Sequence, residues 1–391
     1  MRVSATVVQS EPRPSTPAPQ APRFERVAVT SVFGDPRSPR TWSGAPSNVI
    51  SGLERLGISV EGIWPKLTRW QKLRLAAGQI LAGYGRPITS EQIIRGRGAR
   101  EIRARQLAAA VERLGVRHVL HLGTLDLPAL DLLRGVKHYL YCDQTWALSM
   151  RYRPDRNSYT AKAVEEYERL ERDSLRGLDH VFTFGAYVRD NIVEHYGVSP
   201  ERVTTVGSGM GNVEPYFGPK EYGQAKLLFV AKHLFKAKGG ALLVDAFLRA
   251  HRRRPDLTLT IVGDERSRHF VPSHTGIVFR AHLPWLELQQ LYRTASLLTQ
   301  PMLNDPWGQV YLEALVSRTP VLGLNRNGLP EITEGGRHGF LVDEADPQAL
   351  ADAILAAVEN PRRLAEMGMS GQRHALNTYS WNRVAERIAY R

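Results

Sequence analysis

The chain has 391 residues, of which 42% are hydrophobic and 23% are charged, and its formal net charge is +13. Because one hydrophobic core rarely serves so long a chain, we expect two domains of ordinary size. No apolar run approaches the roughly 20 residues that cross a bilayer, which argues against an integral membrane protein, and the charge predicts attraction to an anionic ligand or surface.

The N-terminal segment and the cysteine content both indicate the cellular compartment of the protein. Residues 1–24 are rich in proline and lack an apolar core with a cleavage site, so we expect a disordered leader rather than a signal peptide. The single cysteine, Cys142, excludes an internal disulfide and a cysteine-based zinc site. Together these features predict a protein of the reducing cytoplasm.

After the leader, short apolar runs alternate with helix-forming segments. Residues 26–32 read as a buried strand, residues 41–46 as a loop containing Gly44 that leads into a helix ending near Gly57, and residues 59–63 as the next strand. Further strands are predicted at 118–122 and 138–142, and two more follow residues 180 and 196. Such βα units predict a doubly wound parallel sheet.

A predicted linker at residues 207–218 separates this series from a second one. Strands are predicted there at 226–231, 257–262, 277–279, 297–299, 321–324 and 340–342. Two successive sets of about six strands predict an α/β protein built from two facing Rossmann-like domains.

Residues 64–105 interrupt the first series with a basic, tryptophan-containing stretch. Trp64 and Trp70 alternate with lysines and arginines, and a run of arginines follows up to Arg105. One interpretation is an amphipathic helix in peripheral contact with an anionic membrane, and the other is a core-facing helix with a solvated basic face. Nucleic-acid binding has the same electrostatic footprint, but no recognition motif accompanies it, so we expect none.

The stretch 300–315 carries the clearest chemistry. An apolar strand, a turn cluster and a helix start follow one another, and the backbone amides near Gly308 and Gln309 would suit a phosphate. Glu313 lies one helical turn after Gln309, where its carboxylate could receive ribose hydroxyls, and Asp305 precedes the helix on the far side of the same phosphates. Alternatively, Asp305 only caps the helix and Glu313 is solvated.

Other candidate residues follow predicted strands. Asp143 ends the strand 138–142, where open α/β sheets place their ligands, although a local turn acid is an alternative. Lys232, Lys236 and Lys238 lie between a strand and a helix, where they would neutralise a diphosphate or simply be solvated. His121 ends a strand and is either functional or a core residue.

The segment from Asp305 to Glu313 resembles the signature of the family 4 retaining glycosyltransferases of the GT-B fold, an acid and a Glu separated by seven residues. The family usually has Glu at the first position and Phe where Trp307 stands here. Segments 196–207, 231–240, 325–331 and 379–388 resemble further family segments in the same order.

The resemblance implies a domain organisation. Residues 25–212 would form the N-terminal, acceptor-side domain and residues 213–376 the C-terminal domain that binds the nucleotide sugar. Residues 377–391 would form a C-terminal helix that crosses back to the N-terminal domain, so that the two domains close on a hinge.

The resemblance also implies roles for residues. Lys232 and Lys238, or Lys236 in place of the latter, would hold the donor diphosphate, and Asp143 would lie close to the reacting sugar and the acceptor. Gly44 would lie in the loop beside the donor phosphates. The weaker candidates, which would face the donor sugar or the base, are Asn327, Gly328 and Glu331.

The expected function is metal-independent transfer of a sugar from a nucleoside diphosphate-sugar to an acceptor hydroxyl with retention, as in a hexosyltransferase of polysaccharide, glycolipid or glycoconjugate synthesis. Cations and a helix start would stabilise the leaving diphosphate, and the sequence has neither a suitable Asp-x-Asp pair nor a His/Cys cluster with ligand spacing. We therefore expect no metal and no cofactor, the donor being a co-substrate. The alternatives are a nucleotide-sugar epimerase and a catalytically degenerate GT-B protein that binds nucleotide or anionic membrane.

Overall fold

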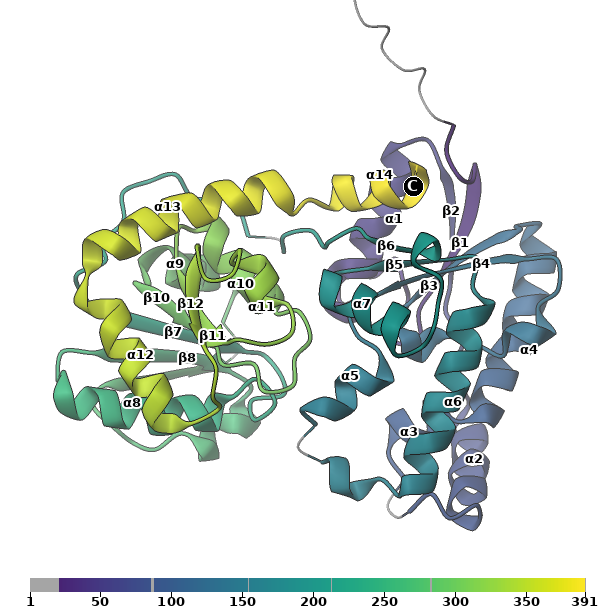
Figure 1. Cartoon of the computed structure of the whole chain (residues 1–391), viewed down its shortest axis with the longest axis horizontal. Coiled ribbons are helices and arrows are strands. Elements are labelled where there is room, and N and C mark those ends of the chain that lie inside the picture. Colours follow the sequence, from purple (N-terminus) through teal and green to yellow (C-terminus); the bar gives the residue numbers. More distant parts are fainter. Residues whose placement is uncertain (1–20, 86–87, 154, 212, 282, 391) are drawn as a thin grey trace, which may run out of the picture.

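The computed structural model describes residues 21–390 apart from 86–87, 154, 212 and 282, so most of the predicted leader lies outside the described residues. The chain forms two halves, each with a parallel six-stranded sheet flanked by helices (Figure 1). The predicted fold class, two Rossmann-like units with a helix crossing back, is confirmed. The predicted domain boundaries remain a prediction.

The sheet of the N-terminal half has the strand order β2-β1-β3-β4-β5-β6. Its four inner strands, β1, β3, β4 and β5, are apolar runs buried on both faces, as parallel strands covered by helices must be, whereas the edge strands β2 and β6 are partly exposed. Their bounds are β1 Arg26–Thr30, β2 Ser59–Ile63, β3 His118–Leu122, β4 Lys137–Cys142, β5 His180–Thr183 and β6 Val203–Thr205.

The sheet of the C-terminal half has the order β12-β11-β10-β7-β8-β9, so the chain reverses its direction of winding between β7 and β10. Ligands of such sheets bind at the carboxyl ends of the strands at this reversal. The bounds are β7 Lys226–Ala231, β8 Thr258–Gly263, β9 Ile277–Ala281, β10 Leu297–Thr299, β11 Val321–Leu324 and β12 Gly339–Val342.

Helices cover both faces of each sheet (Figure 1). Those of the N-terminal half are α1 Ala45–Arg55, α2 Arg69–Leu81, α3 Ser90–Arg95, α4 Arg97–Leu114, α5 Trp146–Arg151, α6 Ala161–Gly177 and α7 Ala186–Glu194. Those of the C-terminal half are α8 Gly240–Arg253, α9 Trp285–Thr294, α10 Gln309–Val316, α11 Leu329–Ile332, α12 Pro347–Glu359 and α13 Pro361–Thr378.

The last helix, α14 (Trp381–Tyr390), leaves the C-terminal half and packs on α1 of the N-terminal half (Figure 1). At its start, Trp381 donates from Nε1 to the carbonyl of Met210, 2.7 Å away in the connecting segment. Near its end, Arg387 donates to the carbonyl of Val206 at 2.9 Å. The crossing helix is therefore fixed to the connection between the halves as well as to α1.

The basic stretch 64–105 divides into two parts. Helix α2 packs one side on α3 through buried Gln79 and half-buried Leu75, whereas Trp70 is 80% exposed and Leu81 is 87% exposed, so the core-facing interpretation holds for only one side of α2. In contrast, Arg100 and Arg103 are buried and donate to backbone carbonyls, so part of the arginine run is interior rather than a basic surface. No helix in the described part of the chain is long and apolar enough to cross a membrane.

Candidate functional site

The candidate site lies at the carboxyl ends of β7 and β10, which are neighbours in the sheet although about seventy residues separate them in the chain. Two backbone hydrogen bonds join the loops that follow these strands: Met302 donates to the carbonyl of Lys238 at 3.0 Å, and Asn304 donates to that of Ala237 at 2.9 Å. The loop after β7, which carries the three lysines (the lysine loop), and the loop after β10, which carries Asp305 (the acidic loop), are therefore held together by main-chain hydrogen bonds.

Asp305 and Lys238 form an ion pair in this place. Their Oδ2 and Nζ atoms lie 3.0 Å apart, and both side chains are largely shielded from solvent. The other carboxylate oxygen of Asp305 accepts from the amide of Gly308 at 3.0 Å. Asp305 thus caps the start of α10, as the alternative interpretation held, and also faces the lysine.

Gly308 has a φ of 76°, a left-handed conformation that glycine adopts without steric cost. Since its amide donates to Asp305, it does not point to an open phosphate seat in this arrangement. Binding of a ligand by the Gly308 amide, for which Asp305 would have to give up this hydrogen bond, stays a prediction.

Glu313 lies on the same face of α10 as Gln309, as predicted. Its carboxylate accepts from the hydroxyl of Tyr292 at 2.7 Å, and Gln309 donates to the carbonyl of Gly209 at 2.7 Å. Burial raises the pKa of Glu313, while Tyr292 and then the charges of Lys232 and Lys238 lower it. Glu313 is therefore not a solvated helix residue, and both lysines lie within electrostatic reach of it.

The three lysines of the β7–α8 loop point to different places. Lys238 pairs with Asp305, whereas the ammonium of Lys236 lies 4.4 Å from the centre of the Phe270 ring. Lys232 is exposed, with its ammonium 5.6 Å from the centre of the Trp285 ring. The arrangement favours Lys238 over Lys236 at the acidic loop.

Asp143 approaches the same place from the N-terminal half. Burial, and then the negative charge of Asp305, raise the pKa of Asp143 to about 7 from its ordinary value of 3.8. The hydroxyl of Tyr187 lies 2.7 Å from the carbonyl oxygens of both Asp143 and Pro306. One hydroxyl of the N-terminal half thus bridges the loop after β4 and the loop that carries Asp305.

Glu331 also forms a contact between the two halves. Its carboxylate accepts at 2.7 Å from the amide of Ala186, the first residue of α7 in the N-terminal half. Asn327 donates to the carbonyl of Asp305 at 3.2 Å. Gly328 packs against Trp307, where a Cβ would approach the indole to 2.6 Å. Thus Glu331 contacts the opposite half, and Asn327 and Gly328 support the acidic loop.

Two of the predicted residues, Gly44 and His121, contact residues outside the acidic and lysine loops. Gly44 has a φ of 85° at the start of α1, and a Cβ there would meet Pro39 and Asn48 of its own loop and helix. His121 is fully buried, with Nδ1 3.2 Å from the Thr30 hydroxyl and Nε2 3.0 Å from His138 Nδ1. The structure places His121 in the interior, as the core-residue alternative held.

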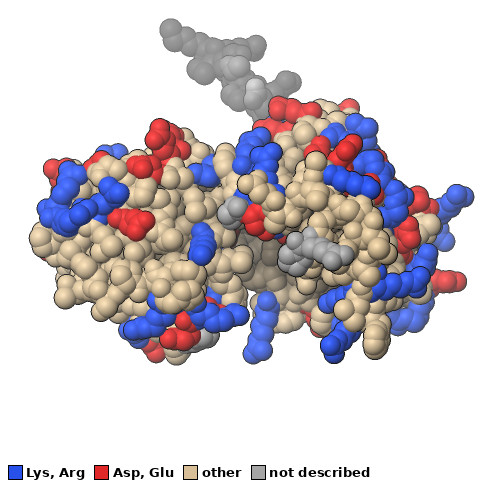
Figure 2. Space-filling view, turned by 90° about the horizontal axis from the view of Figure 1, so that it is seen from below, with Lys and Arg blue, Asp and Glu red and all other residues tan. Residues whose placement is uncertain are grey.

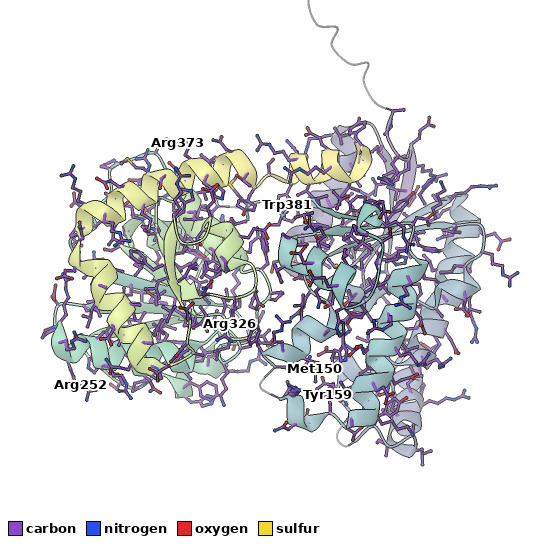
Figure 3. The ribbon with its side chains drawn as sticks, in the orientation of Figure 1. Met150, Tyr159, Arg252, Arg326, Arg373 and Trp381 are labelled. Atoms are coloured by element: carbon purple, nitrogen blue, oxygen red, sulfur yellow. The ribbon has the colours of Figure 1, made fainter. Side chains whose placement is uncertain are left out.

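The sequence analysis missed Tyr187 and Tyr292, two tyrosines whose hydroxyl groups form hydrogen bonds with site residues. Neither lies near an acid or a lysine of the site in sequence, so no local pattern could have indicated it. Arg326 was also missed, although it stands next to Asn327 in the segment 325–331. Its guanidinium lies 4.4 Å from the centre of the Tyr152 ring, and Figure 3 places it on the edge of the C-terminal half that faces α5.

In the space-filling view from below, the surface is hollowed between the two halves, and basic side chains are spread over both (Figure 2). The acids and lysines described above are supplied from both sides of this junction. Such an arrangement can bind an anionic group between cations and acceptor groups, and it can shield that group when the halves close.

Comparisons with known proteins find similar sequences and similar folds. Residues 224–360 match the family model described as "Glycosyl transferases group 1". Alpha-maltose-1-phosphate synthase of Mycolicibacterium smegmatis is 29% identical over 290 residues, which are 66% of this chain and 72% of that protein. D-inositol 3-phosphate glycosyltransferase of Corynebacterium glutamicum is 28% identical over 224 residues, 51% of this chain and 53% of that protein.

Among solved structures, sucrose-phosphate synthase from Thermosynechococcus elongatus is similar to this chain with a TM-score of 0.71. The alignment covers 93% of this chain and 97% of that one at 15% sequence identity. At so low an identity the likeness shows the fold alone. The chain spans about half the length of the corynebacterial relative that it matches.

Proposed function

We propose that this chain, which belongs to the group 1 glycosyltransferases with the GT-B fold, transfers a sugar from a nucleoside diphosphate-sugar to an acceptor hydroxyl with retention of configuration. The observation that carries the proposal is the convergence of Lys238, Asp305 and Glu313 at the reversal point of the C-terminal sheet. A cation between two acids suits a ligand that combines a diphosphate with sugar hydroxyls.

In this proposal the donor diphosphate binds Lys238 and Lys232 in front of α10. As the anomeric bond breaks, negative charge builds up on the diphosphate, and the two ammonium groups stabilise it. Glu313 accepts hydrogen bonds from the ribose hydroxyls, and Tyr292 fixes its carboxylate for that purpose. Because the chain supplies these cations itself, the proposed transfer needs no metal.

The acceptor enters from the N-terminal half, and Asp143 lies close to the reacting carbon. An ionised carboxylate there would stabilise the positive charge that develops on the sugar ring in the transition state. The polysaccharide, glycolipid or glycoconjugate class of the acceptor follows from the resemblance, and pocket shape determines the particular acceptor, sugar and base.

A panel of nucleotide sugars tests the proposal, first by thermal shift and then by release of nucleoside diphosphate. We expect one donor to stabilise the protein and to turn over, and Glu313→Gln to lower turnover on the order of 10²-fold while keeping the hydrogen bond from Tyr292. An epimerised donor would instead support the epimerase alternative. If no donor releases its diphosphate, the chain is a degenerate binding protein.

A second proposal concerns location: helix α2 binds an anionic membrane surface and brings the site to a lipid-linked acceptor. Trp70, Leu73 and Leu81 are exposed on this helix, and no acidic residue occurs between Glu61 and Glu91. Exposed apolar side chains among cations are typical of helices that lie in a membrane interface.

Flotation with vesicles of anionic or zwitterionic phospholipid tests this location. We expect the chain to float with anionic vesicles at low salt, and Trp70→Ser to reduce the bound fraction severalfold. Leu286→Ser is the matched control, because Leu286 is 78% exposed on the other half, on α9. If the chain ignores anionic vesicles at low salt, or if both variants bind as the wild type does, the membrane proposal fails.

A further inference from the structure

Glu334, His338 and His374 form a compact cluster on the C-terminal half, outside the proposed donor site. Nε2 of His338 lies 3.1 Å from one carboxylate oxygen of Glu334, and Nδ1 of His374 lies 3.1 Å from the other. One ligand atom from each residue lies within 4.8 Å of the other two, the one such grouping of three found in the described part of the chain. Spacing alone could not indicate the cluster, because His374 is remote from the other two in sequence.

The backbone holds Glu334 in an unusual conformation. It has a φ of 49°, just after the short helix α11, at a position where glycine or asparagine is the usual choice. Left-handed conformations of larger residues cost free energy and concentrate where a side chain has a specific task. Here the conformation directs the carboxylate to both histidines.

We propose that Glu334, His338 and His374 bind a divalent transition-metal ion such as Zn²⁺. Two imidazole nitrogens and one carboxylate oxygen are a common ligand set for zinc, whereas Mg²⁺ and Ca²⁺ prefer oxygen ligands alone. Ligand atoms about 2.0–2.2 Å from a tetrahedral ion stand about 3.4 Å apart. The two separations of 3.1 Å would widen slightly, and the two histidine nitrogens, which lie within 4.8 Å of each other, would move closer together. The exposed side of Glu334 leaves the fourth position to water.

The surroundings of the cluster fit this role. Nδ1 of His338 lies 3.1 Å from the Ser370 hydroxyl, which fixes the ring with Nε2 toward the carboxylate. The rings of His338 and His374 are stacked with centres 4.8 Å apart. Arg337 is the competing cation, 3.4 Å from the Glu334 carboxylate, but its side chain is 76% exposed and can turn into solvent.

The ion would join two elements that lead to the junction of the halves. Glu334 follows α11, which carries Glu331 and its contact with α7. His374 lies near the end of α13, and its ring is 5.6 Å from that of Tyr379, which in turn packs against Trp307. The bound ion would therefore tie the α11–β12 turn to α13, apart from the residues of the proposed transfer.

Isothermal titration of the tag-free full chain with ZnCl₂ tests the site, with MgCl₂ as comparison. We expect one Zn²⁺ per chain, no response to Mg²⁺, and an increased thermal midpoint with Zn²⁺. Glu334→Gln and His374→Gln should each weaken Zn²⁺ binding at least about tenfold. Because the Glu334 side chain is 42% exposed, Glu334→Gln tests the site with little risk to folding.

His274→Gln is the matched control. His274 also packs against a second histidine of the same half, His251, with ring centres 4.7 Å apart, but it lies outside the cluster. We expect this variant to bind Zn²⁺ as the wild type does. A wild type that binds no Zn²⁺, or Glu334→Gln and His374→Gln variants with wild-type affinity, would overturn the proposal. Neither result would affect the proposed transfer, because nucleoside diphosphate release is measured separately.

Discussion

At the scale of single residues, Lys238 could exchange its ion pair with Asp305 for an interaction with the donor diphosphate. Its ion pair with Asp305 is not fully buried, so solvent still weakens the attraction between the two charges. A diphosphate brings two negative charges and several acceptor oxygens, so it can take the lysine from Asp305 at small cost. Asp305 would then be free to accept a hydroxyl of the donor while still capping α10.

Replacing Lys238 and Lys236 one at a time separates the proposed phosphate ligand from its neighbour. We expect Lys238→Ala to lower turnover on the order of 10²-fold, because it removes a charge partner of the leaving diphosphate. Lys236→Ala should stay close to wild type, since Lys236 lies over Phe270. Steady-state rates of nucleoside diphosphate release provide the measurement. Equal losses in the two variants would contradict the assignment.

Asp143 should give the activity a pH dependence near neutrality. The ionised form is the proposed active form, and its pKa is about 7, so kcat/KM should rise with pH and level off above that value. Asp143→Asn should be slow and should lack this rise. A pH profile of the same shape in Asp143→Asn would show that another group titrates.

Asp143 should also affect folding stability, with the opposite dependence on pH. Because folding raises the pKa of Asp143, the folded state binds more protons than the unfolded state between pH 3.8 and about 7. The free energy of unfolding therefore falls as the pH increases through this range. Asp143→Asn should therefore have a higher thermal midpoint than wild type at pH 8, and this difference should shrink toward pH 4. A constant difference across this range would argue that the raised pKa is not expressed in solution.

Site residues could be predicted where they lie close to one another in the sequence. Asp305, Gly308 and Glu313 share one loop and one helix turn, so their proximity follows from local geometry. Tyr292 and the metal-site candidate His374 could not be found in this way, because the tertiary fold brings them to their partners. The direction of Lys236 could not be foreseen either, since a flexible side chain has no preferred direction in the sequence.

At the scale of elements, the strands were the most predictable feature. Apolar runs such as β1 and β7 are buried on both faces, and the sequence pattern marks them clearly. Helix α2 was less predictable, because an apolar edge suits a core or a membrane equally well. The arginines of α4 were misplaced because their backbone hydrogen bonds to α6 and to the loop after β3 are tertiary contacts.

Helix α14 depends on close contact with α1 at Gly52. A Cβ at this position would lie 2.6 Å from the Ala385 Cβ, so Gly52→Ala should push α14 outward and destabilise the chain by about 1–3 kcal/mol. Gly78→Ala is the control, because a Cβ on this α2 residue meets nothing within 4 Å and should be neutral or stabilising by up to about 1 kcal/mol. Urea unfolding measures both. A Gly52→Ala variant as stable as wild type would mean that α14 is not held this closely.

At the scale of the whole molecule, contacts at the site and at α14 join the halves. Tyr187 bridges two loops, Glu331 caps α7 from the opposite half, and α14 packs on α1. The first two are polar contacts at the candidate site, whereas the third combines apolar packing with hydrogen bonds and lies away from it. This division suits a hinge at α14 and an opening on the side of Tyr187 and Glu331.

Glu331→Ala should shift the molecule toward an open arrangement. Loss of a helix cap costs about 1 kcal/mol, which changes the ratio of closed to open forms about fivefold. We expect a larger radius of gyration in small-angle X-ray scattering without donor, a smaller difference with donor bound, and a raised KM. Glu287→Ala is the control, because Glu287 forms an exposed ion pair with Arg280 within the C-terminal half. If Glu331→Ala and Glu287→Ala scatter alike and have equal KM, the contact with α7 does not control closure.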